Sequence, residues 1–246
     1  MGKYRRDYQT DIIIVGWNKC DVTHACIRSV RRHTLAAHYQ ITYIDNGSDA
    51  DKLQEYILDP FPEINVVRLP FNHGFVRGAN IGLAMSLLTE SEYVLLLNND
   101  TFIPSADDTW LERLTQPMLE DSQIGAVGAV TDNVAGYQKR DAAGEGFTYA
   151  PSLIGFCMLI RKTALRQVGL LDERFTPGNY DDFDYSIRLH RANWNMAVAE
   201  SVWIHHAAHT SFKGLNAQEN FGALLEHNRK QLTDKWNAAD LMRVGL

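Results

Sequence analysis

The chain has 246 residues, a length that fits one large α/β domain with a sizeable core. Hydrophobic residues make up 45% of it and charged residues 22%, which is ordinary globular composition and gives no support to a disordered, collagen-like or coiled-coil structure. Lys and Arg number 24 against 30 Asp and Glu, and the formal charge of -6 has the wrong sign for a general nucleic-acid-binding protein.

The cysteines Cys20, Cys26 and Cys157 are odd in number and form no C-x-x-C pair, so they provide neither a disulfide framework nor a zinc ribbon. The basic start of the chain is followed by only four aliphatic residues, too few for a signal peptide. No apolar run approaches the roughly 20 residues of a membrane span. We therefore expect a cytoplasmic protein without a transmembrane segment, in which any membrane contact is peripheral.

The first 100 residues alternate between apolar strands and helical segments. Strands are expected at residues 12–15, 41–44, 65–69 and 93–97, and helices at residues 21–32, 50–58 and 76–88. β-Branched runs without alternation, such as residues 12–15, are typical of strands buried on both faces of a parallel sheet. The pattern predicts a mostly parallel central sheet flanked by helices, with a Rossmann-like amino-terminal half.

The second half is less regular. Helices are expected near residues 107–120, 181–193 and 217–236, and strands near residues 124–130 and 154–160 and through 203–204. The segment 133–146 is rich in Gly and charge, so we expect it to be mobile and to act as a lid over a bound ligand. No repeat, Pro-rich linker or low-complexity tract divides the chain, so we expect a single domain.

Polar clusters follow three of the expected strands, at residues 16–18, 45–48 and 98–100. Open α/β sheets bind ligands outside the carboxyl ends of their strands, which makes these clusters candidate binding residues. The first two are equally consistent with simple turns, because Asn, Asp, Gly and Ser are the ordinary turn residues. In the third, an all-apolar strand delivers Asp100 into the crevice, where the carboxylate suits Mg²⁺ or Mn²⁺ held together with substrate phosphates. The alternative is an N-cap or Asx-turn.

Further along the chain, Asp181, Asp182 and Asp184 fall within one helical turn, which exceeds what capping needs. One or two of them are accounted for by the preference of helix N-termini for negative charge. Crowded carboxylates also repel each other, which raises at least one pKa and provides a general base.

Three histidines, His205, His206 and His209, follow the strand expected to end at 203–204. One of them could complete the same cation site, but chemistry alone does not select it, and a packed or exposed side chain is the ordinary alternative. Arg77 lies at the start of a helix and is a candidate phosphate or base contact, against simple surface exposure. Its glycine-bearing surroundings lack G-x-G-x-x-G and follow the third strand, which disfavours a Rossmann dehydrogenase.

Taken in order from residue 11 to about residue 212, these motifs resemble the inverting family 2 glycosyltransferases of the GT-A fold, especially the rhamnosyltransferase-like branch. Residues 11–18 are similar to the family's opening strand, and residues 45–49 to its nucleotide-base turn. Residues 72–82 are similar to the helix beneath the nucleotide, and residues 98–101 to the variant DXD motif that binds the metal. Residues 171–184 resemble the stretch ending in Glu-Asp-x-Asp that carries the catalytic base.

The resemblance implies a role for each matching residue. Asp182 is the implied base, and Asp181, which stands where the family has Glu, is a candidate acceptor contact. Apart from the resemblance, Trp203 is a candidate acceptor contact because an aromatic ring can stack on a sugar, and a buried core aromatic is the commoner alternative. Asp100 and His205 are the implied ligands of Mn²⁺ or Mg²⁺, although Ala follows the histidines where the family commonly has Gly. The implied donor-binding residues are Gly16, Trp17, Asn18, Asp45, Asn46, Gly74, Arg77, Asn80, Asn98 and Asn99.

The implied function is transfer of one hexosyl or deoxyhexosyl group from a nucleotide-diphosphate sugar to an acceptor hydroxyl of a glycan or other molecule. The single domain, residues 1–246, would comprise a nucleotide-binding half at about 11–100, an acceptor and catalytic half at about 101–212, and a helical extension at about 213–246. Two alternatives are a sugar nucleotidyltransferase, which normally has a basic Gly-rich loop after its first strand, and a non-catalytic nucleotide-sugar-binding protein. Retention of Asp100 together with Asp182 argues against the second.

Overall fold

The structure of the protein is a computed structural model that describes residues 9–35, 38–104, 108–207 and 217–246. Its first 100 residues form β1 (Thr10–Gly16), α1 (Cys20–Arg32), β2 (Tyr39–Asp45), α2 (Ala50–Leu53), the π-helical turn η1 (Gln54–Leu58), β3 (Asn65–Arg68), α3 (Phe75–Ser86) and β4 (Tyr93–Asn98). The expected strand and helix alternation is therefore present in this half.

The remaining elements are more numerous than expected. They are β5 (Thr101–Phe102), α4 (Trp110–Glu120), β6 (Ile124–Val130), the 3-10 turn η2 (Gly136–Gln138), β7 (Phe147–Tyr149), β8 (Cys157–Arg161), α5 (Lys162–Val168), the 3-10 turn η3 (Glu173–Phe175), α6 (Asp181–Arg191), β9 (Asn195–Trp203), β10 (His205–His206), α7 (Ala217–Lys235) and α8 (Ala238–Arg243). The expected start of the fourth helix at residue 107, and His209, lie outside the described residues.

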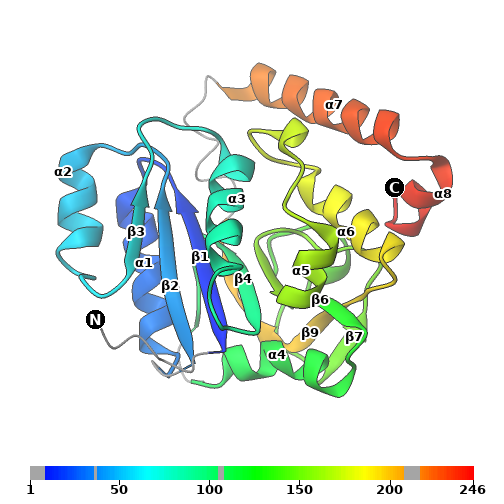
Figure 1. Ribbon diagram of the computed structural model, residues 1–246, viewed down its shortest axis with the longest axis horizontal. Helices are drawn as coiled ribbons and strands as arrows, with labels where there is room; N and C mark the ends of the chain where they lie inside the picture. Colours follow the sequence, from blue (N-terminus) through cyan, green and yellow to red (C-terminus); the bar gives the residue numbers. More distant parts are fainter. Residues whose placement is uncertain (1–8, 36–37, 105–107, 208–216) are drawn as a thin grey trace.

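One eight-stranded sheet runs through the molecule in the order β3-β2-β1-β4-β8-β6-β9-β7 (Figure 1). The pairs β1–β2, β1–β4, β2–β3 and β6–β9 are parallel, whereas β8 runs antiparallel to both β4 and β6, and β7 antiparallel to β9. The architecture is the expected mostly parallel α/β sheet. A separate antiparallel pair, β5 and β10, lies at the carboxyl end of β4.

Every residue of β1 is buried, because helices cover both faces of the sheet. Ile12 and Ile14 pack into the apolar cluster beneath α1 and α4, whereas Ile13 and Val15 pack into the cluster beneath α3, α5 and α6. The side of α3 that faces β1 is glycine: a Cβ at Gly82 would lie 2.2 Å from Ile13 Cγ2. This close approach brings the amino end of α3 to the edge of the sheet where the parallel strands end.

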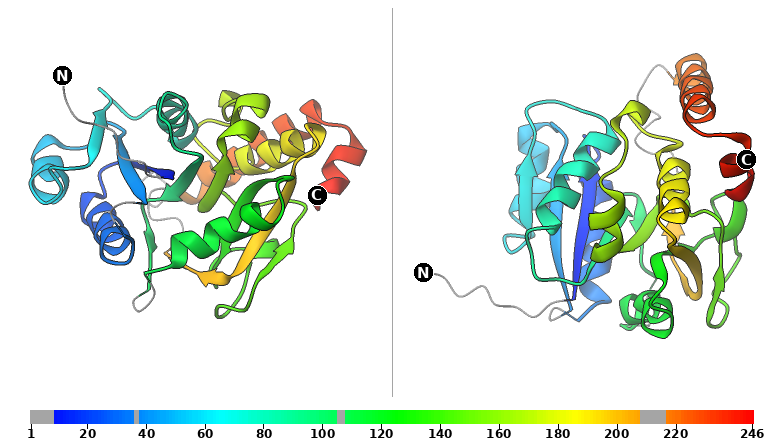
Figure 2. Two further views of the ribbon diagram at one scale, coloured as in Figure 1. Left: turned by 60° about the horizontal axis from the view of Figure 1, so that its bottom comes forward. Right: turned by 45° about the vertical axis from the view of Figure 1, so that its right-hand side comes forward.

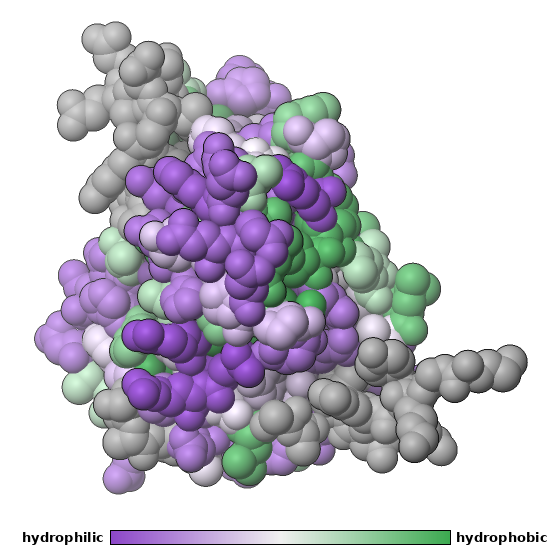
Figure 3. Space-filling view, turned by 90° about the vertical axis from the view of Figure 1, so that its left-hand side faces the viewer, coloured by the Kyte–Doolittle hydropathy of each residue, from purple (hydrophilic) through white to green (hydrophobic). Residues whose placement is uncertain are grey.

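The sheet ends at β3 on one side of the molecule, and all four residues of that strand are exposed or half-buried. Figure 3 shows the face on this side, which is mostly hydrophilic with smaller hydrophobic areas. On the opposite side, α7 and α8 pack over α6 through a third apolar cluster that contains Phe175, Ile187, Leu232 and Val244 (Figures 1 and 2). None of the described helices is long and apolar enough to cross a membrane.

The segment 133–146, which we expect to act as a lid, is hydrogen-bonded to the sheet. Gln138 is 1% exposed; its amide donates to Ala129 O at 2.9 Å and accepts from Ile154 N at 2.5 Å. Arg140 forms an ion pair with Glu200 at 2.6 Å. These bonds attach the segment to the sheet, and its closure over a bound ligand stays a prediction.

Candidate active site

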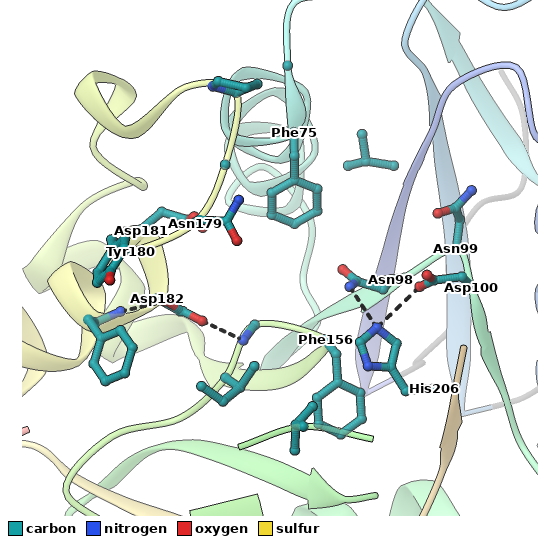
Figure 4. A pocket seen from close by; sticks show the side chains of 18 of the residues that line it. Phe75, Asn98, Asn99, Asp100, Phe156, Asn179, Tyr180, Asp181, Asp182 and His206 are labelled. Atoms are coloured by element: carbon teal, nitrogen blue, oxygen red, sulfur yellow. Dashed lines mark hydrogen bonds and ion pairs between the residues drawn. The ribbon is translucent and has the colours of Figure 1, made fainter. Parts of the chain in front are cut away.

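A cavity of about 500 Å³ opens at the carboxyl ends of β1, β2 and β4 and extends toward the amino end of α6 (Figure 4). Segments from both halves of the chain line it. The candidate residues that line the cavity are Gly16, Trp17, Asn46, Gly74, Asn98, Asn99, Asp100, Asp181 and Asp182. Asp100 and Asp182 face it from opposite sides (Figure 4).

Two candidate donor residues, Asn18 and Asp45, lie behind the cavity wall and hold its turns together. The Asn18 side chain accepts from Asp49 N at 3.1 Å, and its backbone amide donates to Ser48 Oγ at 2.9 Å. Asp45 is fully buried, accepts from Ser48 N at 3.1 Å and lies 3.5 Å from Arg68 Nε. Both residues therefore shape the turn after β2 and do not line the cavity.

The other two candidate donor residues that do not line the cavity, Arg77 and Asn80, lie on α3. Arg77 Nε donates to Glu173 Oε2 at 3.2 Å, and the pair is exposed. The Asn80 amide is buried and exchanges two hydrogen bonds with the backbone of Leu171, each 2.9 Å long. These contacts attach the segment before α6 to α3, so both side chains connect the two halves of the chain.

The donor side of the cavity and the segment before α6 meet at Gly74. Its φ is +84°, and a Cβ at this position would lie 2.7 Å from Thr176 Cγ2 and 2.8 Å from Pro177 Cα. Phe75 N donates to Pro177 O at 2.7 Å across the same junction. Only glycine combines this backbone angle with this approach.

At one end of the cavity, His206 and not His205 lies beside Asp100. His206 Nε2 is 3.4 Å from Asp100 Oδ1 and 3.4 Å from Asn98 Nδ2, and its ring stacks on Phe156 with centroids 5.0 Å apart. Successive side chains of a strand point to opposite faces. In β10 the His206 side chain is therefore buried at the cavity, whereas His205 is exposed and does not line it.

The Asp100 and His206 pair fits a divalent cation. Two neighbouring ligands of an octahedral Mg²⁺ with bonds of about 2.1 Å lie about 3 Å apart, close to the observed spacing of the carboxylate oxygen and the imidazole nitrogen. Among the described residues no group of three or more His, Cys, Asp or Glu gathers as a metal site. A cation held here would take further ligands from a substrate, as Mg²⁺ does with phosphates.

At the other end, the backbone fixes the Asp182 carboxylate. Gly155 N donates to its Oδ2 at 3.1 Å, and Phe183 N donates to its Oδ1 at 2.9 Å. The residues before it, Asn179 and Tyr180, have positive φ angles of 75° and 68°, so the chain turns sharply into α6. Asp182 consequently faces the cavity from the first turn of the helix.

The neighbouring carboxylates differ in their surroundings. Burial raises the pKa of Asp182, and burial together with the adjacent Asp182 charge raises the pKa of Asp181. Asp184 is fully buried away from the cavity, where it pairs with Arg188 and Lys235. Asp184 is therefore the carboxylate of the three that holds the fold together, whereas Asp181 and Asp182 line the cavity.

Trp203, a candidate acceptor contact, does not line the cavity; its indole donates to Arg140 O at 3.4 Å. The cavity has lining residues that the sequence did not indicate, among them Phe156 and Gly155, with Leu225 from α7. A backbone amide such as that of Gly155 has no sequence signature.

A sequence model described as glycosyl transferase family 2 matches residues 11–169, well over half of the chain. The chain belongs to glycosyl transferase family 2. The match includes the donor side of the cavity and Asp100, and it ends before α6 and β10, so Asp182 and His206 rest on the geometry alone. No curated protein sequence matches the chain significantly.

Several solved structures share the fold. GalNAc-T7 with UDP, GalNAc and Mn²⁺ has a TM-score of 0.63 at 15% identity, over 82% of this chain and 44% of that chain. S. aureus TarS 1-349 has a TM-score of 0.63 at 13% identity, over 89% of this chain and 70% of that chain. The mannosyltransferase PcManGT from Pyrobaculum calidifontis, in complex with GDP-Man and Mn²⁺, has a TM-score of 0.62 at 11% identity, over 96% of this chain and 72% of that chain. The family 2 chain thus has the GT-A fold, and it spans less than half of the first of these relatives.

Proposed function

We propose that the protein is an inverting glycosyltransferase that moves one sugar from a nucleotide-diphosphate sugar to an acceptor hydroxyl. The observation that carries the proposal is the single cavity with Asp100 and His206 at one end and Asp182 at the other. Family membership supports glycosyl transfer, and the two relatives crystallised with a nucleotide or nucleotide sugar and Mn²⁺ support the class of donor.

In the proposed reaction, the acceptor oxygen attacks the anomeric carbon as the bond from that carbon to the diphosphate oxygen breaks. Asp182 takes the acceptor proton as a general base, and general-base catalysis typically raises the rate by about 10²- to 10⁴-fold. Attack from the side opposite the leaving group inverts the anomeric carbon through an oxocarbenium-like transition state. The two amides that hold Asp182 keep its carboxylate aimed into the cavity, so little reorganisation is needed when the acceptor binds.

The leaving diphosphate would lie at the end of the cavity with Asp100 and His206, beside Asn98 and Asn99. Mn²⁺ or Mg²⁺ is the cofactor that these residues suit, and when bound it would neutralise charge on the diphosphate as a Lewis acid. The side chain that we propose as the histidine ligand is His206, because His205 is exposed.

Substrate specificity is proposed at a coarser level. Trp17 and Asn46 line the donor side, and we propose a hexosyl or deoxyhexosyl donor, as in the rhamnosyltransferase-like branch. Burial raises the pKa of Asp181, so this carboxyl is suited to donate a hydrogen bond to a glycan or other hydroxyl-bearing acceptor. The three cysteines are free and buried, which supports a cytoplasmic location.

Thermal denaturation with a panel of nucleotide sugars and Mn²⁺ tests the donor, since a ligand at 100 times its Kd stabilises by about 2.7 kcal/mol. Hydrolysis of the stabilising donor, followed by NMR of the released sugar before it mutarotates, tests catalysis and inversion. A donor that binds without turnover would favour a non-catalytic nucleotide-sugar-binding protein. A product of retained configuration would refute inversion.

A further inference from the structure

Asn228 is a buried asparagine in the middle of α7, the helix whose Leu225 lines the cavity. Its side chain is 0% exposed. Its amide nitrogen lies within hydrogen-bond distance of the carbonyl oxygens of Phe175, Gly178 and Asn179, at 3.1, 2.9 and 3.1 Å. Because all three partners are acceptors, the group that faces them is the NH₂ group. A buried NH₂ group is costly unless it is bonded, and these three contacts satisfy it.

The three carbonyls belong to the segment that leads into α6. In this base loop, defined as residues 175–180, Asn179 and Tyr180 both have left-handed backbone angles, which are unfavourable for residues other than glycine. Such a conformation persists only where neighbouring structure holds it. Phe75 N holds the loop from the side of α3 through Pro177 O, and Asn228 holds it from the side of α7.

We propose that Asn228 is a positioning residue for Asp182. Its amide fixes the carbonyls of the base loop, and the loop in turn sets where the first turn of α6 presents its carboxylate to the cavity. That Asp182 is a catalytic base rests on the proposed function, whereas the claim that Asn228 holds the base loop rests on its hydrogen bonds alone. Asn228 does not line the cavity, so it acts through the loop and not on a substrate.

The rest of α7 is anchored without Asn228, which makes the proposal testable in a folded protein. Lys235 donates to Asp172 at 2.7 Å and to Asp184 at 2.5 Å, and Trp236 donates to Asp184 at 2.8 Å. Leu232, one turn from Asn228 on the same face, packs in the apolar cluster with Phe175. Loss of the amide should therefore loosen the base loop while α7 stays docked.

The test uses Asn228→Asp, which keeps the shape of the side chain but turns a carboxylate toward three carbonyl oxygens, and Asn228→Ala as a milder second variant. The matched control is Asn237→Ala, since Asn237 is exposed and its side chain accepts from Asp240 N in α8, away from the loop. We expect kcat to fall about 10- to 100-fold in both Asn228 variants, because displacement of a reacting group by an ångström has effects of this size. The donor Kd and the activity of the control should be unchanged.

Hydrogen exchange gives a readout that does not depend on turnover. The amides of Gly155 and Phe183 donate to Asp182, so they should exchange faster in the Asn228 variants and at the wild-type rate in Asn237→Ala. Unchanged exchange in folded Asn228→Asp or Asn228→Ala would overturn the proposal. In the Asp182→Asn background, Asn228→Ala should lower kcat no further; an added loss would point to a merely structural role. Wild-type protein that turns over no nucleotide sugar would refute the proposed function, while the exchange rates would still decide whether Asn228 holds Asp182.

Discussion

The most informative single substitution is Asp182→Asn, because it removes the proposed base and changes little else. The asparagine oxygen can accept from one of the two amides that now hold the carboxylate, Gly155 N at 3.1 Å or Phe183 N at 2.9 Å. Its NH₂ group then opposes the other amide, at a cost of about 1–3 kcal/mol for an unsatisfied group. Because burial already disfavours the charge of Asp182, the neutral side chain recovers part of this cost.

The effect on catalysis should be larger than the effect on stability. Loss of a general base lowers kcat by about 10²- to 10⁴-fold, equivalent to about 2.7 to 5.4 kcal/mol of barrier at 1.36 kcal/mol per tenfold. For a chain of this size 1 kcal/mol corresponds to about 2–4 °C in Tm, so the variant should melt only a few degrees lower. Donor affinity should be nearly unchanged, since the phosphate end of the cavity is untouched.

Steady-state kinetics, calorimetric titration of the donor with Mn²⁺ and thermal denaturation measure the three quantities separately. Asp181→Asn is the matched control: the pKa of this carboxyl is raised, so Asn imitates its neutral form and should affect the acceptor KM more than kcat. The assignment of the base would be refuted if Asp182→Asn kept more than about a tenth of the wild-type kcat. A loss of less than about tenfold would be smaller than the smallest effect of a general base, which is about 100-fold.

Other predictions concern the cation, pH and packing. Asp100→Ala and His206→Ala should weaken Mn²⁺-dependent donor binding in calorimetry by more than about tenfold, because even the loss of a group that only hydrogen-bonds a metal ligand typically lowers metal affinity by that factor. An equal loss of affinity in exposed His205→Ala would contradict our choice of His206. The pKa of Asp182 is raised and the base must be deprotonated, so kcat should rise with pH through that raised pKa; an acid limb near the ordinary Asp value of about 3.9 would contradict this. Gly82→Ala should destabilise the protein by about 1–3 kcal/mol in urea unfolding, because its Cβ would lie 2.2 Å from a β1 side chain; an unchanged midpoint would refute the close approach of α3.

The amino-terminal half was predictable because its signals are local. The apolar run at residues 12–15 lies within β1 (Thr10–Gly16), and the run at 93–97 lies within β4 (Tyr93–Asn98). Both strands are buried on both faces, so their sequences have no polar alternation, and the turn-forming residues after them mark where they end. The carboxyl ends of these strands form one side of the cavity, as expected for a parallel sheet.

The second half was harder because its structure depends on distant partners. β8 pairs with β4 and β6 in the antiparallel direction, and a five-residue apolar strand carries no mark of the direction in which it will run. β5 and β10 have two residues each, too few for any periodicity. The bonds of Gln138 that attach the segment 133–146 to the sheet likewise join residues that lie apart in the sequence.

The candidate site was predictable in its chemistry but less so in its details. Asp100 and Asp182 face one cavity, as the order of motifs indicated. Arg77 is a candidate because it lies at a helix start, and Asn80 because it belongs to the motif at residues 72–82. Each is bonded to a residue far away in the sequence, 96 positions for Arg77 and 91 for Asn80. The choice between His205 and His206 depends on which face of a two-residue strand meets the cavity, and no motif contains that information.

The position of β8 bears on how this chain can be divided. β8 is hydrogen-bonded along β4, with Tyr93 opposite Arg161 and Leu97 opposite Cys157, so the second half of the chain completes the sheet begun by the first. A fragment ending near residue 100 would leave the backbone donors and acceptors of β4 open along a flat, apolar edge, the kind of surface that drives strands of separate molecules to pair. Such a truncated protein should precipitate, and swapping nucleotide-binding halves between related enzymes would have to carry β8 along.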